Sequence, residues 1–346
     1  MELLNKEWGA WGESAIPPTK IPHLSDRFLP SHLGYFRLTM TALETYTGLM
    51  NPDSKTAIVH AYAKVNLTLY VLGKRPDGFH SIESVIQTIS LHDTLSLSIG
   101  GEPGIRVTCD MPGIPTGEAN LAYKAASLFF EAFGISDGLD IQIEKQIPPE
   151  AGLGGGSSDA AAVLRGLSYM LKRDGELLNL AAQTGSDVPF FLVGGTALIR
   201  GRGEEVQPLP DIPTRWLVIV KPPFGISTSW AYSRLDEVVC RPSSVVRETQ
   251  NISECLQSSV CSMQSLLHND LERPAMERHP EISKIKEILL QTGAQGALMC
   301  GSGSAVFGLF ESKDEAHTAA NRLAGQNIGD LFVTKTITRD EALGKA

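Results

Sequence analysis

At 346 residues the chain exceeds the usual length of one small domain, and its length favours two domains with room for a cleft. Apolar residues make up 42% and charged residues 20%, a balance typical of globular proteins rather than disordered or fibrous ones. The net charge of -9 disfavours general binding to nucleic acids or anionic membranes, because both require a basic surface. No run reaches the roughly 18 apolar residues that a membrane-spanning helix requires.

The cysteines and the first 55 residues bear on where the protein works. The five cysteines are odd in number and contain no C-x-x-C pair, so they predict neither a disulfide framework nor a zinc site. We therefore expect a cytoplasmic protein. Residues 1–55 lack sustained periodicity and the apolar core of a secretory signal, and they are interpreted as an accessory or disordered N-terminal extension. Met40 and Met50 leave the position of the translation start open.

The first strongly patterned segment runs from Val59 to Val71, where every odd position is apolar. Such alternation predicts a half-buried strand that carries Lys64 and Asn66 side by side on its polar face. The alternative for Lys64 is a solvent-facing lysine on an ordinary strand, since most lysines are exposed.

The chain then alternates between strand and helix patterns. Arg75-Pro76-Asp77-Gly78 predicts a turn, followed by Phe79, His80 and a second strand over 84–91. Helical spacing over 120–133 and alternation over 139–143 predict a helix and another strand, in the order β-β-α-β.

A glycine-rich segment joins this last strand to the next predicted helix. Four glycines and two serines lie between Pro148 and Asp159, and a buried helical stripe follows over 160–171. Backbone N–H groups at such a strand-to-helix turn form an anion site at the positive end of the helix dipole. The segment is neither a Walker A loop nor a dinucleotide fingerprint. The alternative is a flexible turn in which Ser158 or Asp159 caps the helix.

A second candidate acid follows a short helix predicted over 176–183. Asp187 lies in Gly185-Ser186-Asp187-Val188-Pro189, where the alternative role is again a helix cap. A strand over 192–199 and a turn over 200–203 predict a hairpin, and residues 208–213 are interpreted as a linker.

The second half begins with a strand predicted over 216–220 and a loop over 224–228, followed by helices. Residues 237–265 are polar and are interpreted as an insertion. Gly301-Ser302-Gly303 lies between two apolar runs and predicts a tight turn between strands.

Together these motifs resemble those of the GHMP small-molecule kinases, over about residues 57–335. The glycine loop and the Gly-Ser-Gly turn indicate the superfamily in general. The Ala-Lys-Val-Asn strand and the Pro-Asp-Gly-Phe-His turn resemble the members that act on a cytidine-bearing alcohol. The motifs that carry the resemblance are residues 63–67, 75–80, 148–159, 185–189, 226–228, 269–272 and 301–303.

The resemblance implies an α+β fold of two domains. A ribosomal protein S5 domain 2-like N-terminal domain would cover 56–210, and a ferredoxin-like C-terminal domain would cover 214–340. The active site would lie between them. Two residues depart from the family pattern: Phe79 replaces the usual Tyr, and Glu150 replaces a small or apolar loop residue. We expect Glu150 to face solvent, because a carboxylate facing inward would repel phosphate.

The resemblance also implies a reaction, in which ATP with Mg²⁺ phosphorylates the 2-hydroxyl of 4-diphosphocytidyl-2-C-methyl-D-erythritol in the non-mevalonate isoprenoid pathway. Lys64 and Asp187 would be catalytic, and no protein residue is assigned to the metal. The residues expected to bind ATP are Pro148, Gly152, Leu153, Gly154, Gly155, Gly156, Ser157 and Ser158. Those expected to bind the alcohol are Asn66, Phe79, His80, Thr228 and Tyr232.

A carboxylate is a far weaker base than an alkoxide, and phosphoryl transfer depends mainly on positioning and charge neutralisation. Asp187 is therefore expected to orient the hydroxyl and accept its proton late, while Lys64 stabilises Asp187 and the developing charge. Three alternatives remain open: a sister kinase for homoserine or a mevalonate derivative, a non-catalytic nucleotide-binding module, and an RNA-binding protein of S5-like fold. The acidic composition disfavours the last of these.

Overall fold

The computed structural model describes residues 55–173, 175–238 and 263–345. The predicted extension, apart from Lys55, and residues 239–262 of the predicted insertion lie outside these ranges. Within them, no helix combines the length and apolar character needed to cross a membrane.

An eight-stranded sheet is organised around one 20-residue strand, β3. One edge of β3 pairs with β1 and then β2, and its other edge pairs with β5 and β6. β4 extends the sheet beside β5, β7 extends it beside β6, and β9 joins β2. The bounds are β1 Thr56–Asn66, β2 Thr68–Lys74, β3 His80–Ile99, β4 Gly104–Cys109, β5 Gly138–Glu144, β6 Thr196–Arg200, β7 Glu205–Pro208 and β9 His268–Asn269.

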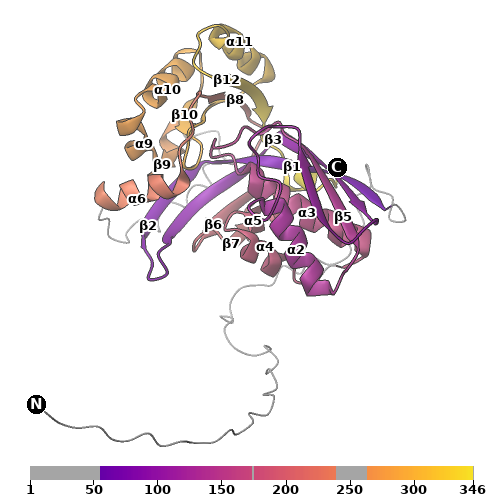
Figure 1. The fold of residues 1–346 in the computed structure, drawn as a ribbon. Coiled ribbons are helices and arrows are strands. Elements are labelled where there is room, and N and C mark those ends of the chain that lie inside the picture. The colour runs from indigo at the N-terminus through magenta and orange to yellow at the C-terminus, as the bar shows by residue number, and fades with distance from the viewer. Residues whose placement is uncertain (1–54, 174, 239–262, 346) are drawn as a thin grey trace, which may run out of the picture. The chain divides into compact units, whose positions relative to one another are not determined.

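Four helices pack with this sheet through small and apolar side chains, and Figure 1 shows them grouped beneath β1 and β3. Asn120 caps the first of them by accepting a hydrogen bond from the Ala122 N–H, and the helix ends at Gly134 in the left-handed conformation. The helices are α2 Leu121–Phe133, α3 Gly155–Leu171, α4 Leu177–Thr184 and α5 Val188–Val193.

A second, antiparallel sheet has the strand order β10-β11-β8-β12. Its strands are β8 Trp216–Lys221, β10 Gly296–Met299, β11 Val306–Phe310 and β12 Asp330–Lys335. The accompanying helices are α6 Thr228–Val238, α8 Met263–Leu266, α9 Glu272–Arg278, α10 Glu281–Gln291 and α11 Lys313–Leu323.

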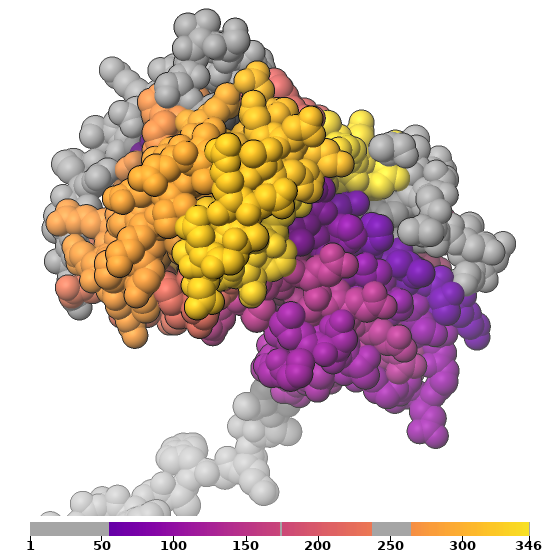
Figure 2. Space-filling view, turned by 90° about the horizontal axis from the view of Figure 1, so that it is seen from above, coloured from indigo at the N-terminus to yellow at the C-terminus, as the bar shows by residue number. Residues whose placement is uncertain are grey.

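The C-terminal segment returns to the first sheet. Ile337 donates its N–H to the Thr88 carbonyl, and α12 (Arg339–Ala342) then lies against Gly194 and Gly195. Both glycines have φ near +67°, and a Cβ on either would come within 2.9 Å of α12 atoms. Figure 2 shows the yellow C-terminal residues resting against the indigo surface of the first strands.

A short parallel pair joins β9 to β2, with Thr68 opposite His268. The Asn269 side chain extends this connection: its amide donates to the carbonyls of Met299 and Gly301, and its oxygen accepts the Leu271 N–H. The residue is 6% exposed, so these three bonds form away from water. Asn269 thereby ties the turn after β10 to the edge of the first sheet.

Most predicted elements are confirmed. The helix at 120–133 is α2, the strand at 139–143 is β5, the helix after the glycines is α3, and the strand at 216–220 is β8. The predicted hairpin is β6–β7, but its first strand begins at Thr196 instead of 192, because Leu192 and Val193 belong to α5. The Gly-Ser-Gly turn joins β10 to β11.

The description of the first strand is wrong in two respects. The segment is divided at Leu67 into β1 and β2, and residues 63–70 are buried on both faces instead of one. The polar face is covered because the glycine loop and the turn at 300–303 lie over it. The order β-β-α-β also omits β4, a six-residue strand that starts at Gly104.

The Asn269 contacts predict a stability effect. Asn269→Ala leaves buried carbonyl and N–H groups without partners, so the free energy of unfolding should fall by about 2 to 4 kcal/mol in urea titrations followed by circular dichroism. Gln295→Ala is the matched control, because that exposed amide makes only a 3.4 Å contact with Glu311. Equal stability of the two variants would contradict the proposed role of Asn269.

Candidate active site

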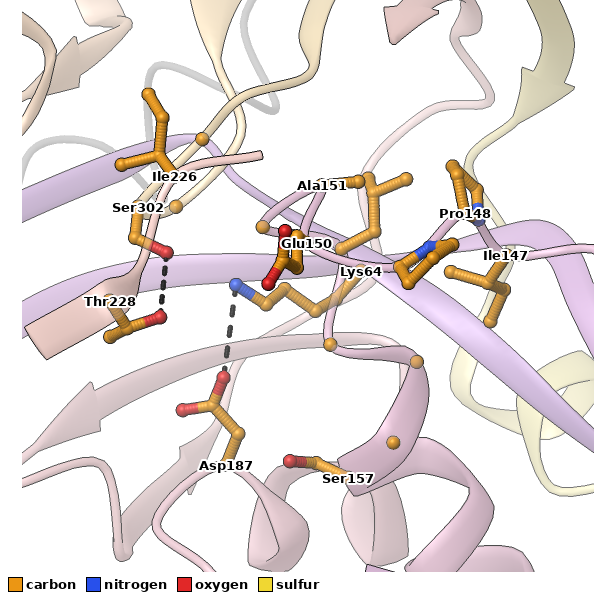
Figure 3. A pocket seen from close by; sticks show the side chains of 18 of the residues that line it. Lys64, Ile147, Pro148, Glu150, Ala151, Ser157, Asp187, Ile226, Thr228 and Ser302 are labelled. Atoms are coloured by element: carbon orange, nitrogen blue, oxygen red, sulfur yellow. Dashed lines mark hydrogen bonds and ion pairs between the residues drawn. The ribbon is translucent and has the colours of Figure 1, made fainter. Parts of the chain in front are cut away.

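A cavity of about 590 Å³ lies where β1, the glycine loop and the Gly301–Gly303 turn meet. Lys64 and Asn66 form part of its lining from β1, residues 147–157 from the loop, and Asp187 from the start of α5. Thr228 and Ser302 line it from the second half, and their hydroxyl oxygens are 2.9 Å apart. Figure 3 shows the side chains of Lys64, Asp187, Thr228 and Ser302 gathered around the same space.

Lys64 is only 5% exposed, so it is not the solvent-facing lysine of an ordinary strand. The pairing of β1 with β3 shifts register between Tyr62 and Lys64. The Lys64 ammonium donates to Asn66 Oδ1 at 2.6 Å and lies 3.8 Å from Asp187 Oδ2, the ion pair drawn in Figure 3. A buried ammonium beside a carboxylate provides a fixed positive charge at the cavity wall.

Asp187 occupies the N-cap position of α5, but its side chain makes no capping hydrogen bond. The capping alternative therefore does not account for this residue. Its side chain is 38% exposed and lines the cavity opposite Lys64. A carboxylate in this position can accept a hydrogen bond from a bound hydroxyl.

Asn66 also lines the cavity, but its amide is already engaged. Its oxygen accepts from Lys64, and its nitrogen donates to Ser84 Oγ at 2.8 Å. With only 3% of its surface exposed, Asn66 holds the Lys64 ammonium in place more directly than it contacts a ligand. The substrate-binding role predicted for Asn66 stays a prediction, since its side chain does line the cavity.

The glycine loop ends at Gly154, the N-cap of α3, which has φ of 74° and provides no capping side chain. The N–H groups in the first turn of a helix have no acceptor within that helix. A Cβ on Gly155 would come within 3.2 Å of Lys145 Nζ and 3.1 Å of Ile147, so a larger residue would move both. The residues from Pro148 to Ser157 line the cavity, as an anion site requires.

Ser158 departs from the prediction that it binds ATP. Its hydroxyl donates to the Tyr62 carbonyl at 2.6 Å, it is 1% exposed, and it does not line the cavity. Neither Ser158 nor Asp159 caps α3. Ser158 therefore anchors the helix to β1.

The glycine loop forms backbone hydrogen bonds with residues from both halves of the chain. The Lys64 N–H donates to the Leu153 carbonyl at 3.0 Å, and the Ser304 N–H donates to the Glu150 carbonyl at 3.2 Å. Glu150 is exposed, as predicted, although it lies at the cavity rim with its carboxylate against Gly225.

Beneath the loop, Lys145 forms ion pairs with two buried carboxylates. Its ammonium lies 2.5 Å from Asp93 and 2.8 Å from Asp159 Oδ2, and all three side chains are at most 6% exposed. Burial raises the pKa of Asp159 to about 7, although the charge of Lys145 opposes this. Burial would lower the pKa of Lys145, but the two carboxylates outweigh it and raise that pKa.

A second cavity, of about 430 Å³, opens beside Phe79 and His80. Phe79 is 50% exposed, and the Arg202 guanidinium lies over its ring at 4.9 Å from the centroid. The His80 ring stacks on Tyr232 at 5.0 Å between centroids. Burial raises the pKa of Tyr232, with Asp187 adding to the effect. The cavity is thus lined with flat aromatic side chains.

The two cavities share four lining residues, Ile82, Asp187, Thr228 and Tyr232. The ammonium of Lys64 and the carboxylate of Asp187 therefore lie where the contents of one cavity can meet those of the other. This arrangement suits the transfer of a group between two ligands.

Several lining residues were not predicted. Ser302 was noted only as part of a turn, and Asp159 only as a cap. Asp236 follows Tyr232 by four positions on α6, so helical spacing would have placed them on one face. Lys74, Lys145 and Arg202 follow no local pattern that sets them apart from surface residues.

Comparisons with known proteins agree with this geometry. Residues 120–195 match the GHMP kinases N terminal domain, and residues 252–328 match GHMP kinases C terminal. A curated 4-diphosphocytidyl-2-C-methyl-D-erythritol kinase from Geobacter sp. (strain M21) is 43% identical over 263 residues, covering 75% of this chain and 91% of the relative. The chain belongs to the 4-diphosphocytidyl-2-C-methyl-D-erythritol kinase family of GHMP kinases. A relative of the same name from Gloeobacter violaceus is 42% identical and covers 82% of this chain and 95% of its own.

Solved structures support the same family. A crystal structure of 4-(cytidine 5'-diphospho)-2C-methyl-D-erythritol kinase is 37% identical, has a TM-score of 0.69, and covers 81% of this chain and 98% of its own. Homoserine kinase from Cytophaga hutchinsonii, 21% identical with a TM-score of 0.65, covers 83% of this chain and 97% of its own and shows the shared fold alone. The α+β GHMP kinase fold is thereby confirmed, while the domain boundaries at 56–210 and 214–340 stay predictions.

The buried Asp159 predicts a pH effect on stability. Its usual pKa of 3.8 rises to about 7 in the folded protein, so between these values the folded protein retains a proton that the unfolded chain releases. Wild-type stability should therefore fall as pH rises through this window. The Asp159→Asn variant lacks this contribution. Its free energy of unfolding, taken relative to that of wild type in urea titrations, should therefore rise from pH 4 to pH 7 by at most about 1.4 kcal/mol per pH unit.

The control for this experiment is Asp140→Asn. Asp140 is a surface carboxylate whose pKa is lowered by the hydrogen bond from Arg106, so its effect should be flat across the same window. A flat profile for Asp159→Asn as well would show that Asp159 is ionised in the folded protein from pH 4 upward.

Proposed function

We propose that this chain transfers the γ-phosphoryl group of ATP, with Mg²⁺, to the 2-hydroxyl of 4-diphosphocytidyl-2-C-methyl-D-erythritol, a step of the non-mevalonate isoprenoid pathway. The observation that carries the proposal is the pair Lys64 and Asp187, 3.8 Å apart, where the two cavities meet. The chain's membership of the family supports the identity of the alcohol.

ATP would occupy the first cavity. Its phosphates would lie at the N-terminus of α3, where first-turn N–H groups and the helix dipole favour an anion. The cavity continues past Asn120 and Lys145 to the apolar side chains of Ile114, Pro115 and Leu121. A flat purine can be buried there while the triphosphate extends toward Lys64.

The alcohol would occupy the second cavity. Phe79, His80 and Tyr232 provide aromatic surface for the cytosine ring, and base–aromatic stacking is worth about 1 to 3 kcal/mol. Thr228 lies at the junction between the cavities and is placed to contact the methylerythritol end. The cationic side chains of Lys74 and Arg202 line the same cavity and suit a diphosphate-bearing ligand.

In the transfer, the bond from the γ-phosphorus to the oxygen bridging it to the β-phosphate breaks, and a bond to the acceptor oxygen forms. Asp187 orients the acceptor hydroxyl and takes its proton late, because a carboxylate is too weak a base to remove that proton first. Lys64 stabilises both the Asp187 carboxylate and the charge on the transferring phosphoryl group. Products are the phosphorylated alcohol, ADP and a proton.

Mg²⁺ fits this site through phosphate oxygens rather than through a protein cage. No group of three or more His, Cys, Asp and Glu gathers among the described residues. Mg²⁺ in kinases is usually held by one or two carboxylates together with substrate phosphates. Asp187 and the Ser157 hydroxyl line the cavity and are placed to contribute. The bound ion would neutralise charge on the phosphates.

The alternatives are less well supported. A kinase for homoserine or a mevalonate derivative has no base to stack, so the aromatic cavity at Phe79, His80 and Tyr232 would have no ligand. A binding module without catalysis would not need Lys64 and Asp187 where the cavities meet. The cytoplasmic location expected from the cysteines stays a prediction.

The chemistry predicts that Asp187→Asn and Lys64→Ala each lower kcat by at least about 100-fold, with the KM for ATP little changed. Coupled ADP release with the cytidyl alcohol measures both constants. Asp137→Asn is the control, since it removes an exposed carboxylate outside both cavities. Near-wild-type turnover in Asp187→Asn would remove this residue from the chemical step.

The acceptor site predicts a separate effect on KM. Phe79→Ala removes the exposed ring, so the KM for the cytidyl alcohol should rise about 5-fold to 150-fold, while Phe79→Tyr should be nearly silent because stacking uses the ring face. The half-exposed ring predicts little loss of thermal stability in either variant. Turnover with homoserine or mevalonate above that with the cytidyl alcohol would reject the assigned substrate but not the kinase fold.

A further inference from the structure

One face of α6 forms a wall of the second cavity. Thr228, Tyr232 and Asp236 recur every four residues along the helix, so they project from the same face, and all three line the cavity. Toward the C-terminal end of this face, Asp236 lies 2.6 Å from His80 and 2.8 Å from Lys74, both of which belong to the first sheet. The sheet therefore fixes the position of α6 at that end.

The other end of the face is held by the turn between β10 and β11. Thr228 is the first residue of α6, and its hydroxyl oxygen lies 2.9 Å from that of Ser302, the contact drawn in Figure 3. Thr228 is exposed, whereas Ser302 is only 9% exposed. Ser302 is thus the fixed partner, and its hydroxyl selects one of the staggered χ1 rotamers that an exposed threonine would otherwise populate.

The turn that carries Ser302 is packed closely against Lys64 and the glycine loop. A Cβ on Gly301 would lie 3.1 Å from Lys64 Nζ and 2.9 Å from the Gly152 carbonyl oxygen. The Gly301 carbonyl also accepts from the buried Asn269 amide at 2.7 Å. The turn therefore has little freedom to move relative to Lys64, and the Ser302 hydroxyl passes this fixed position on to the first turn of α6.

We propose that Ser302 is a positioning residue for the acceptor alcohol: by holding the Thr228 hydroxyl, it sets where the wall of the second cavity stands relative to the Lys64 ammonium. Thr228 lines both cavities, so its hydroxyl lies where the reacting end of the alcohol would meet the phosphoryl donor. Two hydroxyls carry two hydrogens, and their mutual bond uses one, so one remains for a ligand. The inference rests on the proposed function, because it concerns how the acceptor is placed in the same site.

The expected effect is modest and selective for the acceptor. Ser302→Ala removes one neutral hydrogen bond, so we expect kcat/KM for the cytidyl alcohol to fall by about 3-fold to 10-fold. The KM for ATP should change by less than about 2-fold, because the glycine loop keeps its backbone bonds to Lys64 and Ser304. A residue that only stabilised the fold would lower the activity with respect to both substrates alike.

The decisive test is a double-mutant cycle between the two hydroxyls. Thr228→Val removes the hydroxyl with little change of shape, and it should lower the same kcat/KM. Because Ser302 acts through Thr228, adding Ser302→Ala to Thr228→Val should have no further effect, to within about 2-fold. Ser98→Ala is the matched control, since it removes a hydroxyl from β3 outside both cavities and should have a negligible effect in either background.

The outcomes separate this inference from the proposed function. Multiplicative losses in the double variant would show that Ser302 acts on a ligand or on the fold without Thr228, and would overturn the inference while the kinase assignment stands. A wild-type kcat/KM in Ser302→Ala would overturn it as well. Absence of cytidyl turnover in wild type would instead overturn the proposed function.

Hydrogen exchange provides a readout that does not depend on turnover. Loss of the Ser302 contact should speed amide exchange in α6 by at least about 3-fold, measured by mass spectrometry on peptides covering 228–238, while α11 keeps its wild-type rate. Unchanged exchange in α6 would overturn the inference irrespective of the kinetics. Equally faster exchange in both helices would assign Ser302 to general stability and would also overturn it.

Discussion

The backbone hydrogen bonds that hold the glycine loop are the constraint on which the rest of the site depends. On one side, the N–H of Lys64 bonds to Leu153; on the other, the N–H groups of Ser304 and Ala305 bond to Glu150 and Ala151. Gly152 has no room for a side chain, because a Cβ would lie 1.8 Å from the Cys300 carbonyl oxygen. Lys64 therefore anchors the loop with its backbone and reaches the cavity with its side chain. Lys64 thereby fixes the distance between the glycine loop and its own ammonium group at the cavity wall.

Although the protein is acidic, several of its positively charged side chains line the two cavities. The chain carries a net charge of -9, yet Lys64 and Lys145 line the first cavity and Lys74 and Arg202 line the second. Each of these four cations lies within 4 Å of a carboxylate, and Arg202 also lies over the ring of Phe79. Such fixed charges attract anionic ligands without a generally basic surface.

Local patterns in the sequence were sufficient to predict most of the helices and strands, and also to single out the pair Lys64 and Asp187. Alternation identified the strand of Lys64, and the glycine cluster before a helical stripe identified the anion site. Burial of the polar face of that strand could not be predicted, because the segments that cover it lie some 90 and 240 positions away in the chain. For the same reason, the partners of Lys145 and the contact between His80 and Asp236 follow only from the fold. The position of Ser158 in the motif predicts a contact with ATP, but its hydroxyl donates to the Tyr62 carbonyl instead.

The parallel pairing of β2 with β9 has a consequence for synthesis on the ribosome. The N–H of Val71 bonds to Asp270, which follows it by 199 positions, so the edge of the first sheet is completed only after most of the chain has been made. At roughly 5 to 20 residues per second, the nascent chain exposes that edge for about 10 to 40 seconds. An unpaired strand edge is a template for association with other chains. During translation, the edge of β2 therefore stays unpaired until residues 268–270 have been made.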